Sequence, residues 1–344
     1  MKKIIYALGL VVCLFSCTPK EKSHKYSAVT IEILYEDSVS IRAITVLDDN
    51  TLAFAGSKGV YGSIQLTTKK VRTNTQSYDS ILPEFRAVGR TASDFFMLSV
   101  ANPALLYKTG TNGTMELVYK EEGEDVFYDA LMFWNNKEGI AVGDTRNGCL
   151  SIIITRDGGS NWEKVSCDDL PEGIVGEGAF AASNSNIEIV GDSTWIASSK
   201  SRIYFSPDKG RTWSVQSVPI LNEKPSEGIY SVDFYNENLG IAYGGDYTNP
   251  DGNKRNKAIT QNGGQSWELI ADGELPGYKS CVQFFPNSAG EDIVAVGFTG
   301  IAYSNNRGGT WRTLSDEGFY TLRFLNDSTA IAAGRYRIAK IIFN

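Results

Sequence analysis

The sequence predicts an all-β chain: a seven-bladed β-propeller closed by an N-terminal strand that completes the last blade. Three observations carry this prediction. A pair of strand-like runs recurs seven times along the 344 residues. A short polar turn that ends in Trp follows four of these pairs. The last repeat stops on its third strand at Asn344, while an unpaired strand-like segment, 28–35, precedes the first repeat.

Each repeat contains an aromatic-rich run and then a run of small apolar residues that ends near Gly. The first runs are 40–47, 85–89, 127–134, 178–183, 229–235, 280–285 and 319–325. The second runs are 52–56, 95–99, 139–143, 195–199, 240–245, 293–297 and 330–334. Successive repeats are spaced roughly 37 to 54 residues apart, which fits the period of a propeller blade. Residue types alternate within the runs, and Gly, Asn and Asp lie between them, as is typical of antiparallel strands.

Four segments share the pattern Ser/Thr-x-Asp/Asn-x-Gly-x-Ser/Thr/Asn-Trp. They are Thr155–Trp162, Ser206–Trp213, Thr260–Trp267 and Ser304–Trp311, and a degenerate copy begins at Thr109. The Asp or Asn side chain can close a hairpin loop by bonding to the backbone, and Gly can supply a positive φ. The pattern resembles the Asp-box, or bacterial neuraminidase repeat. That resemblance implies a β-propeller in which these residues form structural turns.

The ends of the repeat predict how the ring closes. Residues 28–35 have no blade of their own, and the seventh repeat lacks a fourth strand. Pairing of 28–35 with the strand near 338–343 would complete that blade and remove two exposed sheet edges. We therefore expect one propeller domain over residues 28–344.

The N-terminus has the layout of a secretory signal. Lys2 and Lys3 precede an apolar run of about 12 residues, too short for the roughly 20 that span a bilayer. The tetrapeptide Leu14-Phe15-Ser16-Cys17 resembles the lipobox of bacterial lipoproteins, which implies cleavage before Cys17 and lipid modification of its thiol. Residues 1–16 would be the signal peptide and 17–27 a lipidated Cys with a polar tether. The alternative is an ordinary signal peptide with an incidental Cys.

Composition excludes several classes of protein. The chain has 33 Lys+Arg against 40 Asp+Glu and a pI near 5.0, which argues against nucleic-acid binding. The single histidine, His24, lies in the tether, so the propeller has no histidine for a catalytic triad or a metal site. We expect no metal and no cofactor, a monomer, a place in the bacterial cell envelope, and membrane contact only through the lipid anchor.

Four longer segments, 40–59, 127–144, 170–183 and 226–251, resemble a bacterial group related to the photosystem II stability/assembly factors. The resemblance covers nearly all of residues 36–344 and implies a seven-bladed propeller. Members of this group are often named oxidoreductases, but the sequence has no glycine-rich dinucleotide turn and no CxxC motif to support that activity. The chain is acidic, unlike the photosynthetic factors, so a role in photosystem assembly is not expected.

Propellers bind ligands at the end of the central channel where the inner strands begin. Polar residues at comparable inner-strand positions are Arg42, Arg86, Asp129, Ser231, Ser280 and Thr321. Loops just beyond contribute Asp144, Glu177, Asp246 and Arg335. Charges of both signs around one funnel could hold a sugar acid or a peptide end. The competing interpretation is that these groups pair with one another and rigidify the channel.

These residues favour a binding or assembly scaffold for a protein, peptide or glycan. The alternative is a sialidase-like enzyme, with Arg42, Arg86 and Arg335 as an arginine triad and Glu177 nearby. Against it, the Arg-Ile-Pro motif of sialidases is replaced by Arg42-Ala43-Ile44. A pair of carboxylates among Asp129, Asp144, Glu177 and Asp246 could also serve another glycosidase or a lyase. The propeller region has no histidine and no activated nucleophile, so we assign no catalytic residue.

The cysteines predict one disulfide. Removal of Cys13 and lipidation of Cys17 leave Cys149, Cys167 and Cys281. If the hairpin turns at residues 158–159, Cys149 faces Cys167 with Cα atoms roughly 4.5 Å apart, in an exported protein where disulfides persist. Cys281 would then be a buried free thiol. A register error of one residue would put the pair on opposite faces.

Overall fold

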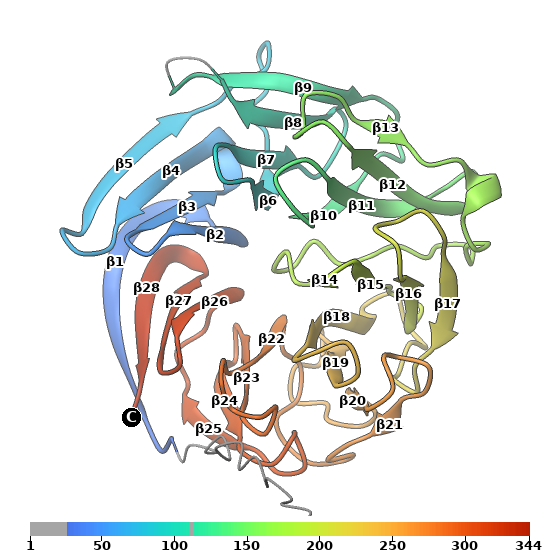
Figure 1. Ribbon diagram of the computed structural model, residues 1–344. Coiled ribbons are helices and arrows are strands. Elements are labelled where there is room, and N and C mark those ends of the chain that lie inside the picture. Colours follow the sequence, from blue (N-terminus) through green and yellow to red (C-terminus); the bar gives the residue numbers. More distant parts are fainter. Residues whose placement is uncertain (1–25, 111–112) are drawn as a thin grey trace, which may run out of the picture.

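The computed structural model describes residues 26–110 and 113–344, which form seven four-stranded antiparallel sheets around a central axis (Figure 1). The predicted seven-bladed β-propeller is confirmed. The first three sheets are β2 (Ala43–Asp48), β3 (Thr51–Ala55), β4 (Val60–Gln65) and β5 (Lys70–Thr75); β6 (Phe85–Arg90), β7 (Phe95–Ser99), β8 (Ala104–Thr109) and β9 (Met115–Glu121); and β10 (Tyr128–Phe133), β11 (Gly139–Arg146), β12 (Cys149–Thr155) and β13 (Glu163–Lys164).

The next three sheets repeat this order from the centre of the ring outward. They are β14 (Ile187–Val190), β15 (Ser193–Ala197), β16 (Arg202–Ser206) and β17 (Ser214–Ser217); β18 (Glu227–Phe234), β19 (Gly240–Asp246), β20 (Lys257–Thr260) and β21 (Glu268–Leu269); and β22 (Cys281–Phe284), β23 (Ile293–Gly297), β24 (Gly300–Ser304) and β25 (Arg312–Ser315). The seventh is β26 (Thr321–Asn326), β27 (Thr329–Ala333), β28 (Arg335–Phe343) and β1 (Val29–Ser40). Two single-turn 3-10 helices, η1 (Ser57–Gly59) and η3 (Cys167–Asp169), lie in connections.

The core lies between neighbouring sheets, where aromatic side chains of one sheet pack on the next. Trp195 of the fourth sheet stacks on Phe234 of the fifth at 3.8 Å between ring centroids. The innermost strand β18 is buried along its whole length, whereas the outermost strand β5 is mostly exposed. Six of the seven aromatic-rich runs, and all seven small-residue runs, therefore coincide with the two strands nearest the axis in their sheets.

β1 occupies the outermost place of the seventh sheet, which is the position that the sequence predicts. Val29 pairs with Phe343 and Ile33 with Ala339. Just before β1, the ring of Tyr26 stacks on Phe285 at 5.0 Å. The two ends of the described chain thus hold each other in one sheet.

The predicted first strand of the fourth sheet, 178–183, is wrong. The innermost strand there is β14, and residues 178–186, here called the crossing segment, run into the central space before it (Figure 1). Ala179, Ala181 and Ala182 are buried in this segment. Their alternation resembles a strand, but their small side chains are what allow the backbone to enter the narrow channel.

The four polar turns are built alike and are structural. In the first of them, the hydroxyl of Thr155 donates to Asp157 at 2.9 Å and accepts from the N–H of Gly159 at 2.9 Å. Ser206, Thr260 and Ser304 make the same two bonds in the other turns. Gly159 has a φ of 80°, and a Cβ there would lie 2.3 Å from the Phe96 ring, so no other residue fits without displacement.

Two faces of the ring follow from this order of strands. At the first, here called the entry face, each innermost strand begins and each second strand ends. The opposite one, the turn face, carries the four polar turns and the connections between first and second strands. The hydroxyl of Tyr26 donates to the carbonyl of Asp327, in the β26–β27 connection, at 2.9 Å. The described chain therefore begins at the turn face.

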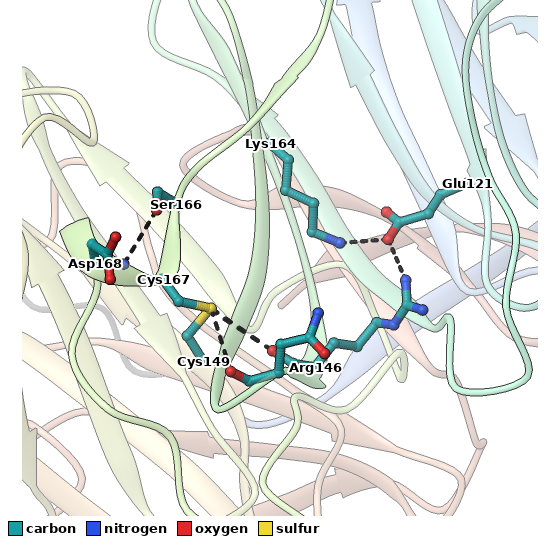
Figure 2. The surroundings of a disulfide bond; sticks show 8 residues. Glu121, Arg146, Cys149, Lys164, Ser166, Cys167 and Asp168 are labelled. Carbon is teal, nitrogen blue, oxygen red and sulfur yellow. Dashed lines mark hydrogen bonds and ion pairs between the residues drawn. A yellow bond between two sulfur atoms is a disulfide. The ribbon is translucent and has the colours of Figure 1, made fainter.

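Cys149 and Cys167 form a disulfide with Cα atoms 5.5 Å apart (Figure 2), and Cys281 is a buried free cysteine. The predicted register is wrong by one residue, since Ile153 pairs with Lys164 and Ile154 with Glu163. β13 ends at Lys164, and Cys167 lies in η3. The single-turn helix, and not the strand pairing, brings the two sulfur atoms together.

An ion-pair cluster beside the disulfide ties the second sheet to the third. Figure 2 shows Arg146 and Lys164 pointing at the carboxylate of Glu121, and Lys164 lies 2.5 Å from it. Burial alone would raise the pKa of Glu121, but hydrogen bonds from Lys164, Tyr128 and Tyr119 outweigh it and lower that pKa to about 2. Within the described ranges, no helix is long and apolar enough to span a membrane. The targeting and lipidation predictions at residues 1–17 lie outside the described residues.

Candidate ligand-binding site

The crossing segment blocks the central channel. Its hydrogen bonds reach the inner strands, or the residues directly before them, in all six other sheets. They are Arg42 to the Ala182 carbonyl (3.2 Å), Asn184 to the Val88 carbonyl (2.8 Å), the Leu131 N–H to Asn184 (2.9 Å), the Val232 N–H to the Ser185 carbonyl (2.8 Å), Ser183 to the Ser280 carbonyl (2.6 Å) and Thr321 to the Ser183 carbonyl (2.8 Å). The channel is thus divided into a cavity at each face.

Three of the polar residues that the sequence predicts around the funnel hold this segment. The hydroxyl of Ser231 lies 2.7 Å from that of Ser185, and Thr321 and Ser280 bond at Ser183. All three are buried. Their role is to rigidify the channel, which is the competing interpretation that the sequence left open.

At the entry face, the crossing segment forms the floor of a cavity of about 260 Å³, here called the basin. Its lining residues are Arg42, Arg86, Phe180, Ala181, Ala182, Tyr230, Tyr247, Tyr278, Phe298 and Tyr320. Phe180 and Tyr230 stack in parallel at 3.8 Å, and Tyr278 meets Tyr230 edge-on at 4.8 Å. The basin is therefore an aromatic wall with two guanidinium groups.

Arg42 is the charged group of the basin that lacks an acidic partner. Its guanidinium lies over the Tyr320 ring, 4.0 Å from the centroid, and its Nε is buried without a hydrogen bond. No carboxylate of the described chain forms an ion pair with it. Burial, and then the charge of Arg86, lower the pKa of Arg42, although a guanidinium stays protonated at neutral pH. An incoming anion would supply the missing counter-charge.

Arg86, the second residue of β6, already has an acidic partner. Its Nε and Nη2 bind Glu84 at 2.7 Å and 2.5 Å. Both groups are partly exposed, so the pair can adjust when a ligand binds. Arg86 therefore adds positive potential to the basin but is a weaker anion site than Arg42.

Asp129 and Asp144 form a pair of acids outside the basin. Asp129 of β10 is fully buried, and its carboxyl shares a hydrogen bond with that of Asp144. Burial, and then the charge of Asp144, raise the pKa of Asp129 well above its usual range. Burial also raises the pKa of Asp144 to about 6, although it accepts the N–H of Ala179 at 3.1 Å. The pair supports the start of the crossing segment, and burial there favours the protonated form of Asp129.

The structure places the other three predicted site residues elsewhere. Glu177 is buried and bound by both Arg202 and the hydroxyl of Ser198, the latter at 2.5 Å. Asp246 lines a separate cavity of about 390 Å³. Arg335 is exposed and lies over the ring of Tyr336 at 4.8 Å.

The predicted funnel is therefore divided. Arg42 and Arg86 meet in the basin, Asp129 and Asp144 meet behind it, and Glu177, Asp246 and Arg335 join neither group. The three arginines of the sialidase-like alternative do not converge, and the carboxylate of Glu177 is already used by Arg202.

The aromatic wall was missed from sequence, although a signal for it exists. Tyr230 and Tyr320 directly precede Ser231 and Thr321, the inner-strand positions assigned to the channel, and Tyr278 comes two residues before Ser280. Residues next to channel-facing positions at the start of a strand can line the same opening. From the sequence, only the polar residues of these runs are assigned to the channel.

A second cavity, of about 320 Å³, lies on the other side of the crossing segment. Two arginines line it: Arg90 is exposed, and Arg323 already donates to the carbonyls of Leu322 at 2.7 Å and Asn184 at 2.8 Å. This guanidinium holds the crossing segment in place. The basin is therefore the stronger candidate for a ligand site.

Comparison with solved structures shows the fold again. YCF48 bound to D1 peptide superimposes with a TM-score of 0.65 at 14% identity, covering 94% of this chain and 100% of that one. YCF48 from Cyanidioschyzon merolae gives 0.64 at 12%, covering 92% and 98%. A GH74 xyloglucanase from Xanthomonas campestris gives 0.63 at 14%, covering 90% and 53%. No family model and no curated protein matches the sequence. At these identities the likeness extends to the fold alone.

Proposed function

We propose that this propeller is a binding protein that holds a carboxylate-bearing ligand in the basin, and that it works as a lipid-anchored scaffold of the bacterial cell envelope. The observation that carries the proposal is the guanidinium of Arg42, which is surrounded by aromatic rings and has no acidic partner in the described chain. Charge pairing is stronger in such a poorly hydrated site than in water. A carboxylate is also the planar group that a guanidinium binds best.

The aromatic wall supports a ligand with an apolar or ring-shaped group next to its carboxylate. A peptide end and a sugar acid both meet this description. One structural neighbour is YCF48 bound to D1 peptide, which supports the peptide. The separation of Arg335 and Glu177 from the basin supports binding without turnover.

The test is a binding panel on the mature protein. It contains short peptides with a free or an amidated C-terminus, and the monosaccharides sialic acid and glucuronic acid, measured by calorimetry. We expect binding of free-carboxylate ligands and at least a tenfold loss in Arg42→Gln, because the carboxylate loses its only unpaired guanidinium.

Arg335→Gln is the matched control, since Arg335 lies on the same face but outside the basin. It should bind like the parent protein. Tyr320→Leu, which removes the ring under Arg42, provides a second basin variant should Arg42→Gln fold poorly. Equal affinity for amidated and free peptides, or no binding of any carboxylate, would contradict the proposal.

A further inference from the structure

Exposed apolar side chains are concentrated on the entry face. Of the ten large hydrophobic residues exposed in the described chain, seven lie in connections of that face, and Tyr336 is the second residue of β28, which begins there. The other two, Ile33 and Leu117, lie in the outermost strands β1 and β9. Beside the basin, Tyr247, Leu275 and Phe298 are 51%, 64% and 45% exposed. Apolar groups gathered on one face of a soluble domain are typical of an interaction surface.

The side chains beside the basin form one patch across the fifth, sixth and seventh sheets. Phe298 packs against Tyr278 with 5.4 Å between ring centroids. The N–H of Tyr278 donates to the Pro250 carbonyl at 2.8 Å, which brings in the loop that carries Asp251. On the other side, Gly318 packs against the backbone of Phe298, so that Asp316 lies nearby. Tyr247, Asp251, Leu275, Phe298 and Asp316 are here called the rim patch.

The rim patch is acidic as well as apolar. Asp251 and Asp316 are exposed, and neither makes an ion pair within the described chain. Lys279 lies within reach of their charge, but it is buried and donates instead to Thr299 at 2.8 Å and to the Gly300 carbonyl. Across the entry face, exposed carboxylates outnumber exposed Lys and Arg, whereas the two are nearly equal on the turn face. The acidic surplus therefore surrounds the cationic basin.

We infer that the rim patch docks a Lys- or Arg-bearing stretch of polypeptide whose C-terminal carboxylate lies in the basin. This inference rests on the proposed function and selects a peptide among its ligands. Cationic side chains can lie over the faces of Phe298 and Tyr247 while they approach the free carboxylates. A sugar acid would fill the basin but offers no cation to the rim patch. Opposite charges also speed association, and salt screens that effect.

The experiment selects ligands from a library of random twelve-residue peptides displayed with free C-termini, using the mature protein in detergent. We expect Lys and Arg to be enriched upstream of an apolar terminal residue. Affinity of a selected peptide should fall at least fivefold between 50 and 500 mM NaCl. Asp251→Lys with Asp316→Lys should weaken binding at least fivefold.

Asp49→Lys with Glu237→Lys is the matched control, because both acids are exposed on the turn face. It should leave affinity unchanged. The docking surface would be overturned by selected peptides that need Arg42 but show no enrichment of Lys and Arg. It would also be overturned if they bound the Asp251/Asp316 variant as well as the parent. Either result would leave the proposed carboxylate binding in the basin unaffected. A binder that is insensitive to Arg42→Gln would overturn the proposed function itself.

Discussion

Arg42 and Arg86 begin equivalent inner strands, yet their surroundings give them different roles. Glu84, two residues from Arg86, neutralises it directly, while Arg42 has only an aromatic ring and a carbonyl. Glu177 shows the opposite case, since its carboxylate accepts hydrogen bonds from Arg202 and three further groups. A polar residue at the channel can therefore bind a ligand or take part in an internal ion pair. The groups that surround it decide between the two roles.

The paired acids Asp129 and Asp144 give a pH-dependent prediction. Both have a pKa that is raised in the folded state, so folding is favoured below the unfolded value of about 4, and that contribution is lost as the pH rises through about 6. Asp129→Asn replaces a carboxyl that loses its proton unfavourably. We expect the variant to be more stable than the parent at pH 8, by about 1 kcal/mol or more in the free energy of unfolding measured with urea. This advantage should shrink at pH 4.

The exposed Asp49→Asn should show no such pH dependence, which makes it the control. If Asp129→Asn changed stability equally at pH 4 and pH 8, the buried carboxyl would not be the source of the penalty.

At this scale the sequence predicts positions better than partners. Arg42 and Arg86 could be placed at the channel because the repeat aligns their strands. The bond between Glu177 and Arg202 could not be predicted, because it joins a long connection to a strand 25 residues later. The aromatic wall was missed because core and channel positions alternate at the start of a strand, and one sequence does not show which way a ring points.

Among elements, the crossing segment departs most from the repeat. The sequence of residues 178–183 alternates like an inner strand, and its spacing fits the blade period. The true strand, β14, begins four residues later, and the small residues before it enter the channel. Local pattern cannot separate the two, because the space that accepts this segment exists only once the other six sheets surround it.

Two asparagines of this segment allow a matched test of its role. Asn184 is buried and bonds to Leu131 and Val88, whereas Asn186 is fully buried and its side chain has no partner. Asn184→Ala should leave backbone groups of two sheets unpaired and cost about 1 to 3 kcal/mol in the free energy of unfolding. Asn186→Ala should cost much less, because it removes no bond. Chemical denaturation measures both.

Asn184 also has a φ of 54°, which an alanine tolerates less well. Asn184→Gly removes the side chain without that strain, and it should still be less stable than Asn186→Gly. Equal stability of the two glycine variants would mean that the segment only fills space.

At the scale of the whole molecule, the ring has two chemically different faces. The entry face has the basin, the exposed apolar side chains and the acidic surplus, and the turn face has the polar turns and the start of the described chain. The sequence predicts the ring and its closure because both depend on a repeat seen over the whole chain. It does not predict the division between faces, which depends on where each connection lies.

This division predicts how the protein is oriented on a membrane. If Cys17 is lipidated, nine residue steps of at most about 3.6 Å separate it from Tyr26, so the anchor lies within about 32 Å of the point where the chain enters the turn face. The turn face should then lie toward the bilayer and the basin away from it, open to soluble partners. With the lipidated protein on vesicles that contain an acceptor-labelled lipid, a donor at Glu237→Cys on the turn face should transfer energy more efficiently than one at Glu223→Cys on the entry face. Cys17→Ser should abolish vesicle binding. Equal transfer from both sites would contradict a fixed orientation, and vesicle binding by Cys17→Ser would contradict the anchor.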